Sequence, residues 1–312
     1  MMDKRVTISI LMPMRNAEAY IVETIQSLLD QTFSDFELII IDDGSSDASL
    51  SMVKSFIDGR IRILKGNMQG ISAALNRGLK SAQGKFVCRC DSDDIYPKER
   101  LQSQIRWFEG HGDFIAVAGK FSSMDEKSKV IAEFKSGESE CDITSELLTG
   151  KTRTHLGTYL VRKNVLDDLG GYREYFVTAE DIDMQLRLAE KGLIGYIPEN
   201  MYFYRIHNDS ITHVQSSNKR EFYESIARDF LKQRLKVGQD DLQRGEAPAP
   251  PAVDNKPKDS SIQILGYLIG ESWRLHGEKK KHAALLVAIR ACTKKPFYWQ
   301  AWKNIIMILI KK

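Results

Sequence analysis

The stretch Lys85–Pro97, KFVCRCDSDDIYP, decides how this chain is interpreted. It begins as a short apolar run typical of a β-strand and then places three carboxylates, Asp91, Asp93 and Asp94, within four residues. Carboxylates at the C-terminal end of a strand lie where open α/β sheets bind their ligands. Because neighbouring acids repel one another, they need a positive partner, and such hard oxygen ligands suit Mg²⁺ or Mn²⁺ that bridges substrate phosphates.

A second interpretation of the same stretch stays open. The residues from Pro97 to Phe108 have a helical pattern, and Asp93 or Asp94 could cap that helix, with Pro97 near its first position. A cap needs one Asp, whereas the stretch has three. Taken alone, the stretch Lys85–Pro97 leaves metal binding and helix capping equally open.

The residues before this stretch repeat its alternation of strand and helix. Apolar strands are predicted at 6–12, 36–41 and 61–64, and each is followed by apolar residues at helical spacing. Four such alternations predict an α/β fold, a mostly parallel sheet flanked by helices with right-handed crossovers. The sequence has neither a G-x-G-x-x-G motif nor a P-loop, which argues against a Rossmann dinucleotide site and a P-loop kinase.

The second half of the chain is more varied. We predict an edge strand at 194–198, where Pro198 interrupts the pattern, and a helix opening at Thr178. Further strands are predicted at 115–119, 130–134, 155–161 and 201–207, and further helices at 222–235, 262–276, 281–292 and 297–312. These elements divide into a domain of residues 1–244, a Pro-rich linker at 245–260 and a helical C-terminal segment at 261–312.

Charge is distributed unevenly along the chain. The net charge is +3, but residues 261–312 hold ten Lys and Arg against two Glu, so this segment carries +8 and the remainder −5. Trp299, Trp302, Lys303, Ile306 and Leu309 could form one face of an interfacial helix. An anionic membrane surface is therefore a candidate partner of the C-terminal segment. The alternative is a helical subdomain packed on the core, with its lysines simply solvated.

The cysteines and the apolar runs indicate the compartment. The four cysteines do not form a disulfide framework, and Cys88 and Cys90 are expected to be small buried side chains of one strand. A zinc site would need more ligands. Met1–Arg5 leads directly into a strand without a signal-peptide pattern, and no apolar run reaches about 18 residues. We expect a cytoplasmic protein, peripheral on the membrane if the C-terminal helix docks.

Several short motifs follow one another along the chain. They are Met12–Asn16, Ile40–Asp47, Gly70 with Leu75–Gly78, Ala82–Lys85, Arg89–Asp94, Gly170–Tyr172, Ala179–Asp181 and Tyr204–His207. This set in this order resembles the family 2 glycosyltransferases, which are inverting enzymes of GT-A fold that use nucleotide sugars. The resemblance covers roughly Val6 to Thr212. It implies a nucleotide-sugar half at about 1–115 and an acceptor half at about 116–244.

The resemblance also implies binding roles on the donor side. Asp42 would accept the uracil N–H of a UDP-sugar, since a carboxylate suits an imide donor. Asp93 would be the first metal ligand, with Asp91 and His207 as further ligands of Mn²⁺ or Mg²⁺. The nucleotide-binding set would be Pro13, Arg15, Asn16, Asp42, Asn76, Asp91 and Ser92. The alternative for the region after 41 is a turn in which Asp42, Asp43 and Asp47 merely hold the next helix, and we expect Asp47 to cap it.

On the acceptor side the resemblance points to Glu180 and Asp181, with Asp181 as the catalytic base that takes the acceptor hydroxyl proton. The alternative is a capping box, because Thr178 and Asp181 have its spacing. Three further candidates are Asp94 as a helix cap or metal support, Arg205 as a phosphate partner and His155 near the acceptor. Arg89 is expected to pair with a nearby acid.

The sequence therefore predicts a metal-dependent inverting glycosyltransferase that moves a hexosyl or N-acetylhexosaminyl group to a saccharide or lipid-linked saccharide. No nucleic-acid partner is expected. Two other classes stay open. A sugar nucleotidyltransferase would usually carry a phosphate loop rich in Gly, Arg and Lys where this chain has Pro13–Asn16. A non-catalytic carbohydrate- or membrane-binding protein would function without Asp93 and Asp181.

Overall fold

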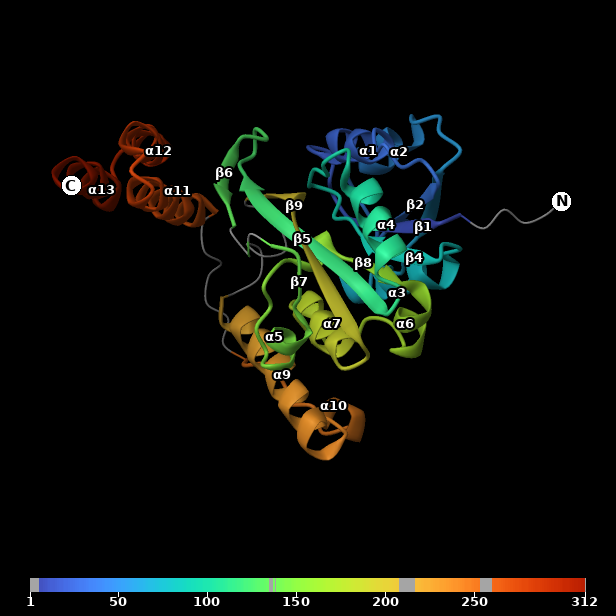
Figure 1. Ribbon diagram of the computed structural model, residues 1–312. Helices are drawn as coiled ribbons and strands as arrows, with labels where there is room; N and C mark the ends of the chain where they lie inside the picture. Colours follow the sequence, from blue (N-terminus) through green and yellow to red (C-terminus); the bar gives the residue numbers. More distant parts are fainter. Residues whose placement is uncertain (1–5, 135–136, 138, 208–216, 253–259, 312) are drawn as a thin grey trace. The chain divides into compact units, whose positions relative to one another are not determined.

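The computed structural model describes residues 6–134, 137, 139–207, 217–252 and 260–311 (Figure 1). Strands and helices alternate through the first part of the chain, as the sequence predicts. They are β1 (Ile8–Met14), α1 (Ile21–Leu29), β2 (Phe36–Asp42), α2 (Ser49–Lys54), β3 (Ile61–Lys65), α3 (Ile71–Ser81), β4 (Phe86–Arg89) and α4 (Arg100–Gly110).

The remaining elements are strands of very different length, interleaved with helices, and then a series of helices. They are β5 (Phe114–Met124), β6 (Val130–Glu133), β7 (Cys141–Asp142), α5 (Thr144–Leu148), the 3₁₀ turn η1 (Leu156–Thr158), β8 (Leu160–Arg162), α6 (Lys163–Asp168), α7 (Glu180–Ala189), β9 (Leu193–Arg205), α9 (Ser217–Val237), α10 (Asp241–Arg244), α11 (Ser260–Gly277), α12 (Lys281–Lys294) and α13 (Trp299–Ile310).

The sheet has the order β3-β2-β1-β4-β8-β5-β9-β7, with β6 paired to β5. The pairs among the first four strands are parallel, and Met14 lies opposite Asp42 while Leu11 lies opposite Arg89. The carboxyl ends of β1, β2 and β4 therefore meet at one edge of the sheet. This arrangement confirms the predicted α/β fold and brings the polar residues that follow each strand to the same place.

The antiparallel part of the sheet corrects two predictions. The strand expected at 155–161 begins only at Leu160, because His155 instead caps the 3₁₀ turn η1 through its side chain. The strands expected at 194–198 and 201–207 form one strand, β9, which runs beside β5 and is not at the edge (Figure 1). The pairing of β9 with β7 ends at Tyr196. Pro198, which has no backbone N–H to donate, lies beyond that pairing and therefore removes no hydrogen bond from it.

The main core lies between the parallel strands and the helices that cross over them. All seven residues of β2 are buried. Ile39 and Ile41 belong to the same apolar cluster as Leu75 of α3 and Met184 of α7. Residues buried on both faces of a strand are typical of a parallel sheet covered by helices. The core thus fixes α3 and α7 against the strands whose ends carry the candidate site.

Contacts divide the chain into two units. The first holds 1–121, 135–203 and 220–251, and the second holds 122–134, 204–219 and 252–312, as far as these ranges are described. The second unit is larger than the segment predicted at 261–312 because Ile131 of β6 and Ile206 pack with Ile264 of α11. The helices α11 to α13 match the helices predicted in that segment.

The predicted linker at 245–260 has structure in its first part. Asp240 forms a capping box with Gln243 at the start of α10, and Gly245 ends that helix in the left-handed conformation. Tyr175 Oη then donates to the Pro248 carbonyl at 2.6 Å. Residues 253–259 of the predicted linker lie outside the described part of the chain. Within the described ranges, no helix combines the length and apolarity needed to cross a bilayer.

Candidate active site

Arg89, the last residue of β4, joins the two acidic motifs. Its Nε donates to Asp91 Oδ1 at 2.7 Å and its Nη1 donates to Glu180 Oε1 at 2.7 Å. Burial opposes the charge of this guanidinium, but the carboxylates of Asp91 and Glu180 outweigh it and raise the pKa of Arg89. The prediction that Arg89 pairs with an acid is confirmed, and the ion pairs bring Asp91 next to the start of α7.

The start of α7 presents Glu180 and Asp181 without a capping box. The helix begins at Glu180, and the residue before it is Ala179, which has a left-handed backbone (φ 61°) and no side-chain acceptor. Thr178 is therefore not the cap, and the capping-box alternative is wrong. A left-handed alanine costs roughly 1–2 kcal/mol, and such strain is often found at functional turns.

His155 lies against the candidate base. Its Nδ1 accepts from the Gly157 backbone N–H at 3.1 Å, so the proton of the neutral ring is on Nε2. That Nε2 is 3.6 Å from Asp181 Oδ2. Burial lowers the pKa of His155, while Asp181 and Asp91 oppose the shift and Arg89 adds to it. The neutral ring thus directs an N–H toward the Asp181 carboxylate.

Two tyrosines hold the acids that follow β4. Tyr202 of β9 donates to Asp94 Oδ2, and its ring stacks on His155 with centroids 5.1 Å apart. Tyr96 Oη accepts from the Asp91 backbone N–H at 2.6 Å. Burial raises the pKa of both phenols, and the nearby carboxylates add to this shift, so both hydroxyls keep their protons. Tyr202 therefore connects the acids after β4 with the acids at α7 through His155.

The helix-capping interpretation of Asp93 and Asp94 is wrong. Helix α4 begins at Arg100, six residues after Asp94, and the residue at its cap position is Glu99. Pro97 is consequently not in the first turn either. Asp94 is 1% exposed and accepts from Tyr202, whereas Asp93 is partly exposed. The acids after β4 need an explanation other than a cap.

These acids fit a metal that is shared with a substrate. In the described ranges, no group of three or more His, Cys, Asp and Glu is placed to hold a metal by itself. Mg²⁺ and Mn²⁺ bound to phosphates often take one or two carboxylates from the protein. Asp91 and Asp93 supply such oxygen donors at the carboxyl edge of the sheet. The proposed third ligand, His207, is buried in the second unit.

The loops after β1 and β2 are tied to each other. The Asn16 backbone N–H donates to Ser45 Oγ at 3.1 Å, and Asn16 Oδ1 accepts from the Ser46 N–H at 2.8 Å. Pro13 is opposite Ile41 in the sheet, and Arg15 is exposed in this loop. The predicted nucleotide-binding residues on β1 therefore stand beside the residues that follow β2.

Asp42 and Asp43 have different surroundings. Asp43 accepts from the N–H groups of Met68 and Gly70 at 2.7 and 3.0 Å, so it holds the loop before α3. Asp42 accepts from the Ser45 N–H at 3.0 Å and is 9% exposed at the sheet edge. Asp42 ends β2 opposite Met14 of β1, and Asp91 follows β4 on the other side of β1. Two strand spacings, roughly 10 Å, therefore separate Asp42 from Asp91.

Three predicted residues prove to have structural contacts. Asp47 accepts from the Ser49 N–H at 3.0 Å and so supports the start of α2, although the cap position itself is Ala48. The Asn76 amide donates to the Tyr172 carbonyl and accepts from the Tyr172 N–H, at 2.8 and 2.7 Å. The buried Arg205 guanidinium donates to Ser128 Oγ at 2.9 Å. If Asn76 binds the nucleotide or Arg205 binds a phosphate, each does so in addition to these hydrogen bonds.

Sequence reasoning missed Tyr96 and Tyr202 as parts of the site. The alternation along β9 shows that Tyr202 and Tyr204 share a face, but it does not show which face meets Asp94. The sequence did contain one signal for Tyr96, which comes directly after the acidic cluster and within reach of the Asp91 backbone.

The predicted residue Ser92, which stands between Asp91 and Asp93 in the sequence, is buried.

The fold defined by this sheet and site is that of the GT-A glycosyltransferases. The solved structure of S. aureus TarS, residues 1–349 in complex with UDP-GlcNAc, aligns with a TM-score of 0.57 and 18% identity. The alignment covers 97% of this chain and 90% of the TarS chain. At this identity the likeness shows the fold alone.

The sequence places the chain within that class. The sequence profile of glycosyl transferase family 2 matches residues 9–170, which include Asp42, Asp91 and Asp93. The putative glycosyltransferase EpsE of Bacillus subtilis is 31% identical over 65% of this chain and 74% of EpsE. The minor teichoic acid biosynthesis protein GgaB of the same organism is 27% identical over 70% of this chain, which spans about a quarter of GgaB. The chain belongs to glycosyl transferase family 2.

Proposed function

We propose that this glycosyltransferase moves one sugar from a UDP-linked donor to a hydroxyl of a saccharide or lipid-linked saccharide, with inversion at the anomeric carbon. The observation that carries the proposal is the Arg89 bridge, which joins Asp91 on the donor side to Glu180 beside Asp181. A donor-side acid and a candidate base held close to each other by a buried arginine are what a single displacement requires, because both ends of the reacting bond must be held together.

The donor side of the proposal rests on Asp42, Asp91 and Asp93. Asp42 would accept the uracil N–H at the edge of the sheet, and Pro13, Arg15 and Ser92 would border the nucleotide. The UDP-GlcNAc bound in the TarS structure supports a UDP-linked donor. A divalent metal held by Asp93 and Asp91 would offset the negative charge of the departing diphosphate.

The acceptor side of the proposal rests on Asp181. Its carboxylate takes the proton of the acceptor hydroxyl while that oxygen forms a bond to the anomeric carbon. The bond from that carbon to the diphosphate oxygen breaks, and its electron pair leaves with UDP. The N–H of His155 orients the carboxylate, and Arg89 fixes Glu180 one residue before it. Inversion follows because the base and the leaving group are on opposite faces of the sugar.

The similarity to GgaB, a minor teichoic acid biosynthesis protein, supports a role in making teichoic acid or a related surface polysaccharide. The experiment that tests the reaction measures UDP released from UDP-GlcNAc and from UDP-glucose, with saccharide acceptors and with lipid-linked ones. We expect UDP release that depends on acceptor and that Asp181→Asn lowers by roughly 10²–10⁴-fold. The exposed Asp113→Asn serves as a charge-matched control. Release of pyrophosphate instead of UDP would indicate a nucleotidyltransferase.

A further inference from the structure

Helix α13 has large apolar side chains on its exposed side as well as a buried side. The buried side holds Ala301, Ile308 and Asn304, whose amide donates to Ser272 Oγ at 2.9 Å. The other side presents four large apolar side chains at intervals of three and four residues, which lie on one face of a helix. They are Trp299, Trp302, Ile306 and Leu309, exposed by 68%, 47%, 46% and 53%. An amphipathic helix in a folded unit normally exposes polar residues there.

The turn before α13 extends this apolar surface. Phe297 is fully exposed, and Ile310 at the other end of the helix is 70% exposed. We call Phe297, Trp299, Trp302, Ile306, Leu309 and Ile310 the α13 face. Trp302 Nε1 donates to the Pro296 carbonyl at 2.7 Å, so its ring is held in place. Large apolar side chains gathered in this way on a surface usually mark a binding surface.

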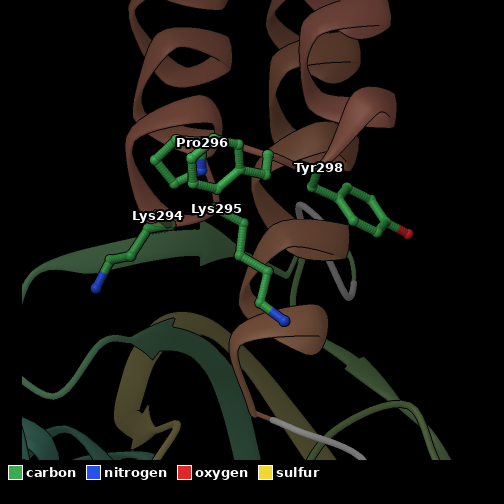
Figure 2. A pocket seen from close by; sticks show the side chains of 5 residues that line it. Lys294, Lys295, Pro296 and Tyr298 are labelled. Atoms are coloured by element: carbon green, nitrogen blue, oxygen red, sulfur yellow. The ribbon is translucent and has the colours of Figure 1, made fainter.

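Lysines lie beside the α13 face at the turn before the helix and on the helix itself, and one of them, Lys294, pairs with Asp125 at 3.4 Å. An open hollow of about 380 Å³ at the turn is lined by Lys294, Lys295, Pro296, Phe297 and Tyr298. In Figure 2 the side chains of Lys294 and Lys295 extend away from the Pro296 ring. Lys303 is exposed one residue after Trp302. Residues 261–312 carry +8, so a partner of this surface should be negatively charged.

We infer that the α13 face is a docking surface for an anionic lipid bilayer. Tryptophan and phenylalanine beside lysines on one short helix suit the boundary between headgroups and acyl chains. Lys311 lies over the Trp273 ring at 5.1 Å, so a further cation is fixed at the far end of the helix. The helix has twelve residues, which is too short to span a bilayer, and it therefore lies in the plane of the surface.

Vesicle binding by the full chain tests this inference without any sugar chemistry. Co-sedimentation is measured with phosphatidylcholine vesicles that contain or lack phosphatidylglycerol, together with tryptophan fluorescence. The test variant is Trp299→Gln/Leu309→Gln/Ile310→Gln. The matched control is Leu286→Gln/Ile289→Gln, which removes exposed apolar side chains from α12. Circular dichroism checks that both variants fold.

We expect the wild type to bind the anionic vesicles, with a blue shift of its fluorescence, and to bind neutral vesicles far more weakly. The α13 variant should lose about tenfold or more of this affinity, Lys303→Gln about fivefold, and the α12 control little. Three results would overturn the inference. The first is that the α13 variant binds the vesicles as well as the wild type does. The second is that soluble polyphosphate removes all vesicle binding. The third is that the wild type self-associates and the α13 variant does not, which would make the α13 face an interface between copies of the chain.

Discussion

Arg89 is the residue that holds the two acidic motifs together. It is 8% exposed, and its two partners, Asp91 and Glu180, come from the turn after β4 and from the start of α7. Glu180 is buried, and burial raises its pKa while Arg89 opposes that shift. Removal of the guanidinium would leave two poorly solvated carboxylates close to each other, which is far more costly than loss of a surface ion pair.

We therefore predict that Arg89→Met lowers the free energy of unfolding by about 3 kcal/mol or more. Arg220→Met is the matched control, because Arg220 of α9 pairs with Glu224 in a more exposed ion pair and should lose no more than about 1 kcal/mol. Urea unfolding of the two variants measures the difference. Equal losses would show that the Arg89 network does not stabilise the site.

His155 makes stability depend on pH in a direction that its surroundings set. Its pKa in the folded chain lies below the usual 6.5, because burial outweighs the attraction of Asp181 and Asp91. The unfolded chain therefore binds more protons just below pH 6.5, and the stability present above that pH is lost as the pH falls.

The predicted result is a fall in unfolding free energy below about pH 6.5 that is smaller in His155→Gln than in the wild type. Glutamine keeps an acceptor for the Gly157 N–H and a donor toward Asp181. Chemical denaturation between mildly acidic and neutral pH provides the measurement. Parallel pH profiles of the two proteins would contradict the assigned ring state.

At the residue scale, the sequence identifies acids well and their contacts poorly. Asp91 and Asp181 stand out because they follow recognisable strands and turns. The sequence does not show that Arg89 reaches both Asp91 and Glu180, since residues 89 and 180 are 91 positions apart. The same holds for Tyr202, whose partner Asp94 comes from a different part of the sheet. Such contacts depend on the strand order, which a local pattern does not contain.

At the scale of elements, the turn after α6 is fastened to α3. Gly170 and Gly171 both have a positive φ, at 73° and 75°. A Cβ on Gly171 would lie 2.4 Å from Asn76 Oδ1, whereas a Cβ on Gly170 meets nothing within 4 Å. The Asn76 amide makes its two hydrogen bonds to Tyr172, so it has little freedom to move aside.

The two glycines give a matched pair of variants. Gly170→Ala should cost about 1 kcal/mol of unfolding free energy from backbone strain alone. Gly171→Ala should cost about 3 kcal/mol, because the clash also breaks the two Asn76 hydrogen bonds. Thermal and urea unfolding compare them. Equal costs would mean that the Asn76 contact contributes nothing beyond the backbone conformation.

Strongly periodic elements were predictable and irregular ones were not. The strands β1 to β4 occur where apolar runs predict them, and the burial of β1, β2 and β4 on both faces leaves a clear signal. The apolar run from 155 to 161 also resembles a strand, but the His155 side chain captures the Gly157 N–H and favours a 3₁₀ turn. Such local competition between side chain and backbone is not visible in hydrophobic periodicity.

At the scale of the whole molecule, the boundary of the C-terminal unit was the least predictable feature. The helices α11 to α13 were evident from composition, but the inclusion of Ile131 and Ile206 in their cluster was not. Apolar side chains far apart in sequence choose their partners through the tertiary fold. The family resemblance, in contrast, was evident from motifs at the ends of successive strands, which the sheet brings to one edge.

We propose that this edge of the sheet binds a UDP-sugar through a metal at Asp93. Calorimetric binding of UDP, with and without Mn²⁺, is the most direct test when wild type, Asp93→Asn and the exposed control Asp113→Asn are compared. We predict that Mn²⁺ strengthens UDP binding in the wild type and the control and that Asp93→Asn loses this gain. UDP binding that is absent in the wild type, or that is the same with and without Mn²⁺, would contradict it.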